Sequence, residues 1–229
     1  KLANKPLGLK QLSSPPVSTK ALIDWFFAPI LAPGSIGFSN VLAPLSTVEA
    51  LVSDLAPLAV ETPTGAKQLD PATRDNIQIA FESWLGRLSS NPDNIGVFYF
   101  CGHGLMVSEH FLVAEDFGRS NAQPWSQAFD ISTTIKAVER EAAGTIYFFI
   151  DACREIARDV ATTLGANPNA LQAVDLNKKV IRKSVTTIYA TGEGELAFAP
   201  QGGNVSRFTS ALLSAMSGYA GIKAPGRAD

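Results

Sequence analysis

The sequence predicts an α/β fold, in which one mostly parallel sheet carries helices on both faces. Residues 95–100 and 146–150 are short apolar runs rich in β-branched and aromatic side chains, which is typical of buried strands. Segments with apolar residues at helical spacing lie before, between and after these runs. Strands that alternate with helices along a chain usually form a parallel sheet covered by those helices. The expected architecture is therefore a three-layer sandwich.

Length and composition indicate a single domain over residues 1–229. The chain is 46% hydrophobic and 17% charged, which is enough for one sizeable core. Residues 1–16 are expected to be a loop segment. The chain starts with Lys1 and an irregular stretch, so we expect that an upstream element precedes this sequence.

Charge and cysteine content exclude several classes of partner. The net charge of −2 provides no basic field for nucleic acid or an anionic membrane. No apolar run reaches the 18 residues of a membrane-spanning helix. Two cysteines cannot form a disulfide framework, and this favours a reducing, cytoplasmic location.

The first predicted helix follows the loop segment. Ser18 or Thr19 is expected to cap it, apolar residues line one side, and Pro29 or Pro33 ends it. Residues 34–42 are then predicted to be a strand.

A less regular region leads to the second clear helix. Residues 47–55 are predicted as a short helix, and the remainder of 44–70 as loop. Asp70 is the expected N-cap of the next helix and Pro71 its first residue. Apolar residues at helical spacing give this helix one face toward a sheet, namely Ile77, Phe81, Trp84, Leu85 and Leu88.

The second half of the chain alternates more regularly. After the strand at 95–100, we expect a hairpin over 105–113, a helix over 130–143 and the strand at 146–150. The next segment, residues 155–184, is polar and becomes basic toward its C-terminal end. The last predicted elements are a strand over 185–190, a glycine-rich acidic loop and an amphipathic helix over 206–216.

Two residues just past strand ends are the candidates for chemistry. Of the two histidines and two cysteines, only His103 and Cys153 both follow the carboxyl ends of strongly predicted strands. Ligands bind at that edge of an open α/β sheet. An imidazole near a thiol can generate or stabilise the nucleophilic thiolate. Taken singly, either residue is more often a buried structural side chain, and it is their joint placement that favours a catalytic pair.

The glycines around His103 allow an oxyanion site. The N–H of Gly104 and the N–H of Cys153 are the candidate donors to a developing negative charge. Cys101 is interpreted as structural. A metal site on Cys101 and His103 stays open, but zinc requires three or four ligands and no second Cys/His cluster exists, so we expect no metal.

Two motifs then make the sequence recognisable. F-Y-F-C-G-H-G at 98–104, followed by F-F-I-D-A-C-R at 148–154, resembles the caspase-like cysteine proteases, which include caspases, metacaspases and bacterial relatives. The segments 185–198 and 206–213 are similar to the specificity loop of that family and the helix after it. The resemblance spans about residues 18–218 and implies the caspase-like version of the three-layer sandwich.

The resemblance implies a role for each matching residue. Cys153 would be the nucleophile, His103 the general base and acid, and Gly104 and Cys153 the oxyanion donors. Asp151 would line the substrate pocket, where a carboxylate favours Arg or Lys on the acyl side of the cut. Glu193 and Glu195 on the glycine-rich loop could add to this, although a solvated acidic loop explains them equally well.

The sequence departs from the family at several points. Asp151 replaces the glutamine of true caspases, as in metacaspases, and Glu155 replaces the usual glycine. The first strand of the family is not evident before residue 18. Residues 155–184 are a candidate processing loop, because the basic stretch 178–183 lies after the nucleophile where relatives are cut. An exposed charged loop is the simpler explanation.

The function that follows is a cysteine endopeptidase cleaving proteins or peptides after Arg or Lys, as a regulated bacterial defence or cell-death effector. The alternative is a catalytically silent caspase-like scaffold that binds a partner. Another thiol hydrolase on a doubly wound sheet is a weaker third. We expect a regulatory protein or a fused domain as partner. We expect no cofactor, and the scattered acidic residues, which form no D-x-D-x-D-G loop, leave calcium activation open.

Overall fold

The computed structural model describes residues 9–120, 122–141, 144–154, 167–175, 177, 184–192, 194 and 203–219. Its centre is a parallel sheet of β3 (Ile95–Gly102), β7 (Thr145–Ala152) and β8 (Ser184–Tyr189), with β7 in the middle. Ile95 lies opposite Thr145, and Gly102 lies opposite Ala152. All three strands were predicted from their apolar and β-branched runs, and the predicted parallel sheet is confirmed.

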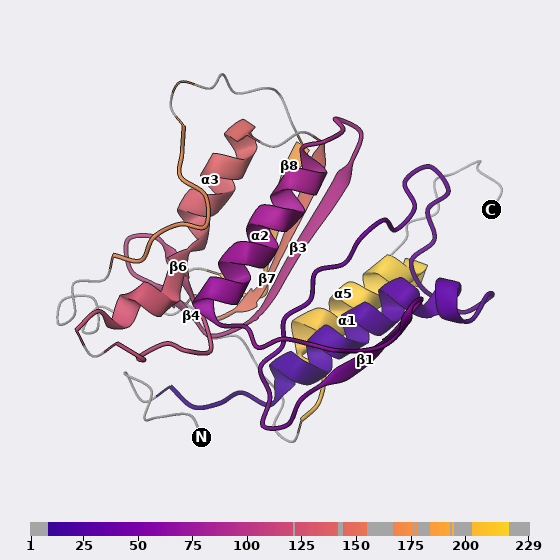
Figure 1. The fold of residues 1–229 in the computed structure, drawn as a ribbon, viewed down its shortest axis with the longest axis horizontal. Coiled ribbons are helices and arrows are strands. Elements are labelled where there is room, and N and C mark those ends of the chain that lie inside the picture. The colour runs from indigo at the N-terminus through magenta and orange to yellow at the C-terminus, as the bar shows by residue number, and fades with distance from the viewer. Residues whose placement is uncertain are drawn as a thin grey trace.

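Helices cover both faces of this sheet (Figure 1). α2 (Arg74–Leu88) and α3 (Ile131–Glu141) lie on one face, and α1 (Ser14–Leu31) and α5 (Arg207–Ser214) lie on the other. A short π-helix, η3 (Ala215–Tyr219), continues α5. The three-layer sandwich is therefore confirmed in the described part of the chain.

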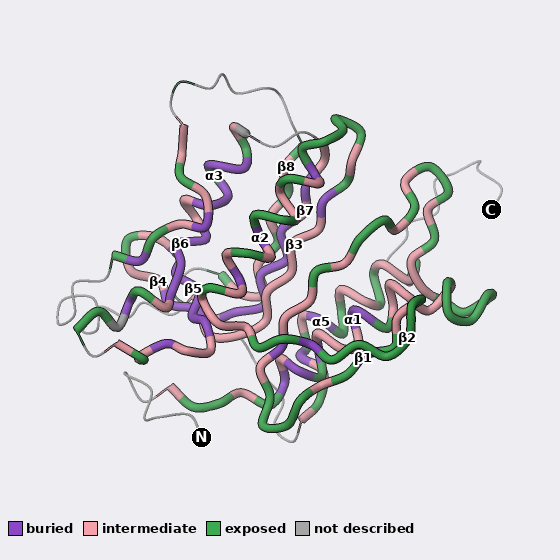
Figure 2. The backbone as a smooth tube through the Cα atoms, viewed as in Figure 1, coloured by how far each residue is buried: buried purple, intermediate pink, exposed green. Residues whose placement is uncertain are grey.

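The main core lies between the sheet and the α2–α3 layer. Alternate residues of a strand point to opposite faces, so the even-numbered side chains of β7 enter this core. The most buried segments of the chain run through β7, α3 and β5 (Figure 2). The buried members are Ile77, Phe81, Leu88, Leu112, Ala114, Phe129, Ile131, Ile135, Val138, Ile146, Phe148, Ile150, Ala152 and Leu171.

A second, antiparallel sheet extends from the end of β3. It consists of β4 (Gly104–Met106), β5 (His110–Val113) and β6 (Ala128–Asp130), with β5 in the middle. The β4–β5 hairpin was predicted, whereas the three-residue β6 was not. A short 3-10 helix, η2 (Pro124–Gln127), leads into β6. The second sheet holds the residues after His103 against the main core.

The region before α2 differs most from the prediction. Residues 34–42 contain bends and coil instead of a strand, and residues 47–55 do not form a helix. A hairpin of β1 (Ala59–Thr62) and β2 (Gly65–Gln68) lies where loop was expected. Ile36, Val41 and Leu42 are 68, 93 and 97% exposed. These apolar side chains suggested a strand, yet they are exposed to solvent.

Two helix starts were also placed wrongly. α1 begins at Ser14, about one turn before the predicted cap, because prolines are tolerated in the first turn where no backbone donor is needed. α2 begins after Thr73, whose hydroxyl accepts a hydrogen bond from the backbone N–H of Asn76. A local cap inside the predicted helix thus set its start, rather than Asp70 and Pro71.

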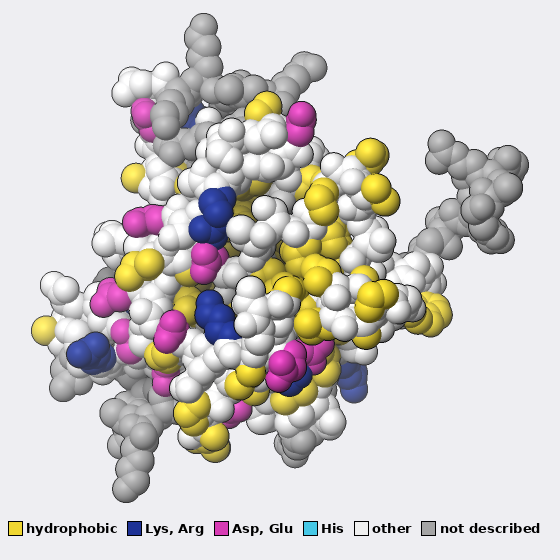
Figure 3. Space-filling view, turned by 45° about the vertical axis from the view of Figure 1, so that its right-hand side comes forward, with side chains coloured by type: hydrophobic (Ala, Val, Ile, Leu, Met, Phe, Trp, Pro, Cys, Tyr) yellow, Lys and Arg dark blue, Asp and Glu magenta, His cyan; other side chains and the backbone are white. Residues whose placement is uncertain are grey.

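The side of the molecule that carries α1 and the β1–β2 hairpin is rich in exposed apolar groups. Figure 3 shows hydrophobic side chains gathered on this side, with few charges among them. Exposed large hydrophobic residues of the N-terminal region are Val17, Ile30, Leu31, Ile36, Val41, Leu42 and Leu55. Even so, none of the helices in the described residues is long and apolar enough to cross a membrane.

Candidate active site

His103 and Cys153 immediately follow the ends of two neighbouring strands. Gly102 and Ala152 lie directly opposite each other in the β3–β7 ladder, so the next residues leave the sheet at the same edge. Neighbouring strands are about 5 Å apart. Strand alternation puts the two side chains on the face that α1 and α5 cover. The fold therefore brings the predicted base and nucleophile to one place.

The imidazole of His103 is oriented by a backbone carbonyl. Its Nε2 lies 2.7 Å from the carbonyl oxygen of Lys10. A carbonyl only accepts hydrogen bonds, so this contact requires the proton on Nε2. In the neutral ring Nδ1 then carries the lone pair. The backbone is held as well, because the N–H of Val113 donates to the carbonyl of His103 at 3.1 Å. The Lys10 contact thus fixes which nitrogen of the neutral His103 ring carries the proton.

Gly104 lies against the backbone of Cys153, the predicted nucleophile. A Cβ atom at this position would lie 2.4 Å from the carbonyl oxygen of Cys153 and 2.9 Å from Cβ of Ala152. Any residue other than glycine would force these groups apart. The glycine predicted to give backbone access therefore permits a close approach of β4 to the residue that follows β7.

The N–H of Gly104 points away from its neighbouring strand. His103 and Val113 are opposite in register and hydrogen-bonded, and such pairs alternate with non-bonded pairs in an antiparallel ladder. Gly104 and Leu112 therefore form a non-bonded pair. This leaves the Gly104 N–H directed outward from β5, which is the orientation that an oxyanion donor needs.

His110 is a second histidine at the site. It lies on β5, is 0% exposed, and its Nε2 is 3.0 Å from the carbonyl oxygen of Cys153. Burial lowers the pKa of His110 to about 4, while the backbone contact to Cys153 acts in the opposite direction. Sequence reasoning set this residue aside because it does not follow a predicted strand. The only signal was that the chain contains just two histidines.

Asp151 lies two residues before the nucleophile and on the same sheet face. Its side chain is buried, and Oδ2 accepts hydrogen bonds from the hydroxyls of Ser206 and, at 2.9 Å, Thr209. The Thr209 hydroxyl also lies 2.6 Å from the hydroxyl of Tyr99. This network joins the carboxylate to the first turn of α5, and its partners lie 55 and 58 residues further along the chain.

Cys101 lies on β3 beside this network. Burial raises the pKa of its thiol, and the charge of Asp151 acts in the same direction. The thiol is therefore protonated at neutral pH, and a protonated thiol is a poor nucleophile. These properties agree with the structural interpretation of Cys101.

The other predicted substrate contacts, Glu193 and Glu195, lie outside the described residues, as does the basic stretch 178–183. The described part of the glycine-rich loop is nevertheless next to the site. The N–H of Gly194 donates to the carbonyl of Arg154 at 2.9 Å, and the Arg154 guanidinium lies 4.4 Å from the ring centre of Tyr189. The loop after β8 thus contacts the residue that follows the nucleophile.

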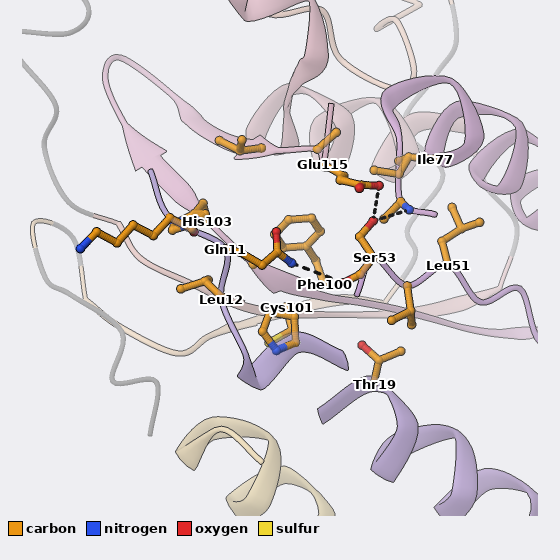
Figure 4. Close-up of a pocket in the computed structure, with 17 residues that line it drawn as sticks. Gln11, Leu12, Thr19, Leu51, Ser53, Ile77, Phe100, Cys101, His103 and Glu115 are labelled. Carbon is orange, nitrogen blue, oxygen red and sulfur yellow. Dashed lines mark hydrogen bonds between the residues drawn. The ribbon is translucent and has the colours of Figure 1, made fainter. Parts of the chain in front are cut away.

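A small cavity of about 90 Å³ adjoins His103. One wall is polar, where Ser53 donates a hydrogen bond to Glu115 at 2.7 Å and accepts one from the N–H of Ala72 (Figure 4). Gln11, from the segment that also holds Lys10, reaches the carbonyl of Ser53 at 3.5 Å. Among the residues that the structure describes, no group of three or more His, Cys, Asp or Glu side chains could hold a metal ion.

Comparison with known proteins agrees with this geometry. A family model for the caspase domain matches residues 40–224, which is well over half of the chain. The chain belongs to the caspase family. The resemblance found in the sequence is thereby confirmed, and with it the caspase-like fold. At the level of the family, this is a cysteine peptidase domain.

A curated relative extends the comparison across most of the chain. It is described as "Uncharacterized protein y4kE" of Sinorhizobium fredii, and it is 36% identical over 214 residues. The match covers 90% of this chain but 60% of the relative. The caspase domain described here therefore spans less than two thirds of the length of that protein.

Proposed function

We propose that this caspase-family protein is an active cysteine endopeptidase, with Cys153 as nucleophile and His103 as general base and acid. The observation that carries the proposal is the pair of opposite strand ends. Both residues leave the sheet at one edge and on one face, and the Lys10 carbonyl holds Nε2 of His103 so that Nδ1 is the basic atom. A thiol and an oriented imidazole are the parts that nucleophilic acyl transfer requires.

The proposed reaction has two halves. Nδ1 of His103 accepts the thiol proton as Sγ of Cys153 attacks the scissile carbonyl carbon. The backbone N–H groups of Gly104 and Cys153 stabilise the oxyanion. The imidazolium then gives the proton to the leaving amine, and a thioester remains. In the second half, His103 takes a proton from water, which attacks the thioester, and returns it to the departing Cys153 sulfur.

Variants of the pair test the proposal. Cys153→Ala and His103→Ala should each lower kcat/KM on a cleaved peptide by at least about a thousandfold, because each removes a member of one catalytic unit. Lys20→Ala, an exposed change on α1, is the control and should leave kcat/KM unchanged. Cleavage that persists in Cys153→Ala would contradict the proposal. A wild-type protein that cleaves nothing and does not react with peptidyl electrophiles would favour the scaffold alternative.

We further propose that the enzyme prefers Arg or Lys on the acyl side of the cut. Asp151 supports this preference because it is an acidic side chain on the same sheet face as Cys153, two residues before it. Both hydroxyl donors reach the same oxygen, Oδ2. A cationic side chain would approach from the Oδ1 side and form a charge-assisted hydrogen bond.

Matched peptides separate charge from shape in this specificity. Peptides with Arg, Lys, citrulline or Asp at the acyl position should be cleaved in that descending order, since citrulline keeps the shape of arginine without its charge. In Asp151→Asn, Arg and citrulline peptides should become similar substrates. A wild-type enzyme that cleaves best after Asp would contradict the preference, while leaving the catalytic pair intact.

We also propose that the protein acts as a regulated effector of bacterial defence or cell death in the cytoplasm. The caspase domain and a bacterial relative support the effector role, and Cys101 and Cys153, which form no disulfide, support the cytoplasmic location. Processing within 178–183 would be one means of regulation. Intact masses of wild type and Cys153→Ala after incubation test it, and identical masses would exclude processing by the enzyme itself.

Slower growth of bacteria expressing wild type, but not Cys153→Ala, would support the effector role.

A further inference from the structure

The environment of His110 is unusual for a buried histidine. Its ring lies within the fold at 0% exposure, and its Nδ1 has no hydrogen-bond partner among the described residues. A buried polar atom without a partner destabilises a fold, and a leucine or phenylalanine at this position would avoid that cost. The atom that does have a partner, Nε2, contacts the carbonyl of the proposed nucleophile.

The contact fixes the tautomer of the ring. The carbonyl of Cys153 can only accept, so Nε2 of His110 must carry the proton and donate it. The second nitrogen, Nδ1, then has only a lone pair. His110 is therefore a fixed donor at this site and is not arranged to remove a proton from the thiol.

Both ends of this contact are held by other elements. The backbone N–H of His110 donates to the hydroxyl of Ser132 on α3 at 3.0 Å. The ring packs on Tyr189 of β8, with centres 5.7 Å apart. A Cβ on Gly104 would lie 2.7 Å from Nε2, so β4 closes the remaining side. The imidazole has little room to move, and neither has the carbonyl that it holds.

Cys153 needs such a restraint because it is the first residue past β7. Its neighbour Ala152 is still paired in the β3–β7 ladder, whereas Cys153 and Arg154 are not in a strand. Fixing the Cys153 carbonyl restricts rotation about the bonds of Cys153. Rotation about the N–Cα bond would move the Sγ atom relative to His103.

We propose that His110 is a positioning residue, which donates Nε2–H to the Cys153 carbonyl and thereby holds the proposed nucleophile in its reactive geometry. The effect of His110 on catalysis rests on the proposed peptidase function. Its restraint of the Cys153 backbone does not depend on that function. His110 acts through the backbone of Cys153, whereas His103 is the proposed base that exchanges protons with the reacting atoms.

Three variants separate positioning from stability. His110→Leu fills the space of the ring with an apolar side chain that has no donor. His110→Gln instead keeps an N–H group near the position of Nε2. Phe111→Leu changes the next buried residue on β5, which packs in a different cluster. We expect His110→Leu to lower kcat by about ten- to a hundredfold, as misplacement of a reactive group does, with little change in KM. His110→Gln should recover most of kcat, and Phe111→Leu should lower Tm but keep kcat.

Two measurements do not need peptidase activity. In long-range ¹H–¹⁵N spectra of protein labelled in its two histidines, His110 should be the Nε2–H tautomer from pH 5 to pH 8. Intact-mass kinetics with iodoacetamide should show Cys153 reacting several-fold more slowly in His110→Leu than in wild type or His110→Gln.

The outcomes distinguish the two proposals. A wild-type protein without Cys153-dependent cleavage, but with the expected tautomer and alkylation rates, would overturn the peptidase proposal and support positioning. The Nδ1–H tautomer, an unchanged alkylation rate in His110→Leu, or a His110→Gln variant as impaired as His110→Leu would overturn the positioning role. If His110→Leu does not fold, the wild-type tautomer and the His110→Gln kinetics still decide whether His110 is a positioning residue.

Discussion

A Cβ atom on Gly104 would lie within 2.4 Å of the Cys153 carbonyl oxygen and 2.7 Å of Nε2 of His110. Real Cβ atoms do not come that close to backbone oxygens, so β4 or the nucleophile must shift. Gly104→Ala should therefore lower stability by about 1–3 kcal/mol through overpacking. It should also lower kcat/KM by more than the fraction of unfolded protein explains, because the displaced atoms carry the proposed reaction.

Gly86 provides the matched control. It lies within α2, and a Cβ there would meet nothing within 4 Å. Gly86→Ala should stabilise the protein by about 0.5–1 kcal/mol, since alanine favours the helix. Urea unfolding measures the stability of Gly104→Ala and Gly86→Ala, and peptide cleavage kinetics measure their kcat/KM. A Gly104→Ala protein as stable and active as wild type would refute the close packing at Cys153.

The lowered pKa of His110 predicts a pH dependence of stability. Burial holds its pKa at about 4 in the folded state, against the ordinary 6.5, and the nearby Arg154 cation acts in the same direction. Between these values the unfolded chain binds the proton and the folded protein does not. Stability contributed by the neutral ring is thus present above pH 6.5 and is lost as the pH falls toward 4, by on the order of 3 kcal/mol.

His110→Gln has no titrating group at this position and should lose that part of the pH dependence. Urea unfolding of wild type and His110→Gln from pH 4 to pH 7 measures this pH dependence. The contributions of all other titrating groups cancel when the free energy of unfolding of the variant is subtracted from that of wild type. Parallel stability curves for the two proteins would show that His110 is not held neutral by burial.

At the residue scale, sequence could place the two proposed reacting side chains at strand ends, but it could not show what orients them. His103 and Cys153 follow recognisable strands, so their residue types and positions suffice to predict the pair. The Lys10 carbonyl that orients His103 is a backbone atom, and every residue has one. Asp151 was predicted from its place before Cys153, whereas its partners Ser206 and Thr209 become neighbours only through the fold.

At the scale of elements, α5 is docked on the sheet by hydroxyl groups. Ser206 caps the helix by accepting from the N–H of Thr209 at 3.0 Å, and it also donates to Asp151. The N–H of Ser206 donates to the hydroxyl of Ser18 on α1 at 2.9 Å. The charge of a buried carboxylate is stabilised by such donors, so the start of α5 and the position of Asp151 depend on each other.

Thr209 allows this coupling to be measured. Thr209→Val keeps the shape but removes the donor to Asp151 and the partner of the Tyr99 hydroxyl, and it should cost about 1–3 kcal/mol of stability. Thr209→Ser keeps the hydroxyl and loses one methyl group, which should cost only about 1 kcal/mol. Denaturant unfolding gives the free energy of unfolding of both variants for comparison with wild type. A valine variant at least as stable as the serine variant would show that these hydrogen bonds do not hold α5 on the sheet.

The elements that sequence predicted best are those with long apolar patterns fixed by burial. β3, β7, α2 and α3 each have such a pattern, and each pattern faces the main core. The strand expected at residues 34–42 failed because its apolar side chains face solvent, where periodicity carries no information about the backbone. β6 was missed because three residues are too few to show an alternation, and its pairing partner β5 lies 15 or more residues earlier.

At the scale of the whole molecule, the two sheets share one core. Leu112 of β5 and Phe129 of β6 pack in the same cluster as Phe148 of β7. His103 is the single residue between β3 and β4, so the chain passes from one sheet to the other at the proposed base. Local unfolding of either sheet would therefore separate His103 from Cys153. We expect peptidase activity and global structure to be lost together.

The three tryptophans report on different parts of this assembly. Trp84 packs beside the main core, and Trp125 is buried in the cluster of the second sheet. Trp25 lies on α1, where its indole N–H donates to the Ser217 hydroxyl at 3.0 Å. Three variants, each keeping one tryptophan and carrying phenylalanine at the other two positions, would follow each region separately by fluorescence.

A single domain predicts that fluorescence of the three variants changes cooperatively and in step with the far-ultraviolet circular dichroism of the same protein. Each variant has its own stability, so the comparison is made between two probes within one protein rather than between proteins. For Trp25, a fluorescence midpoint at lower urea than the circular dichroism midpoint would mean that α1 and α5 unfold before the sheet. The chain would then contain a second unit, and Asp151, which lies beneath α5, would be exposed while the proposed catalytic pair was still folded.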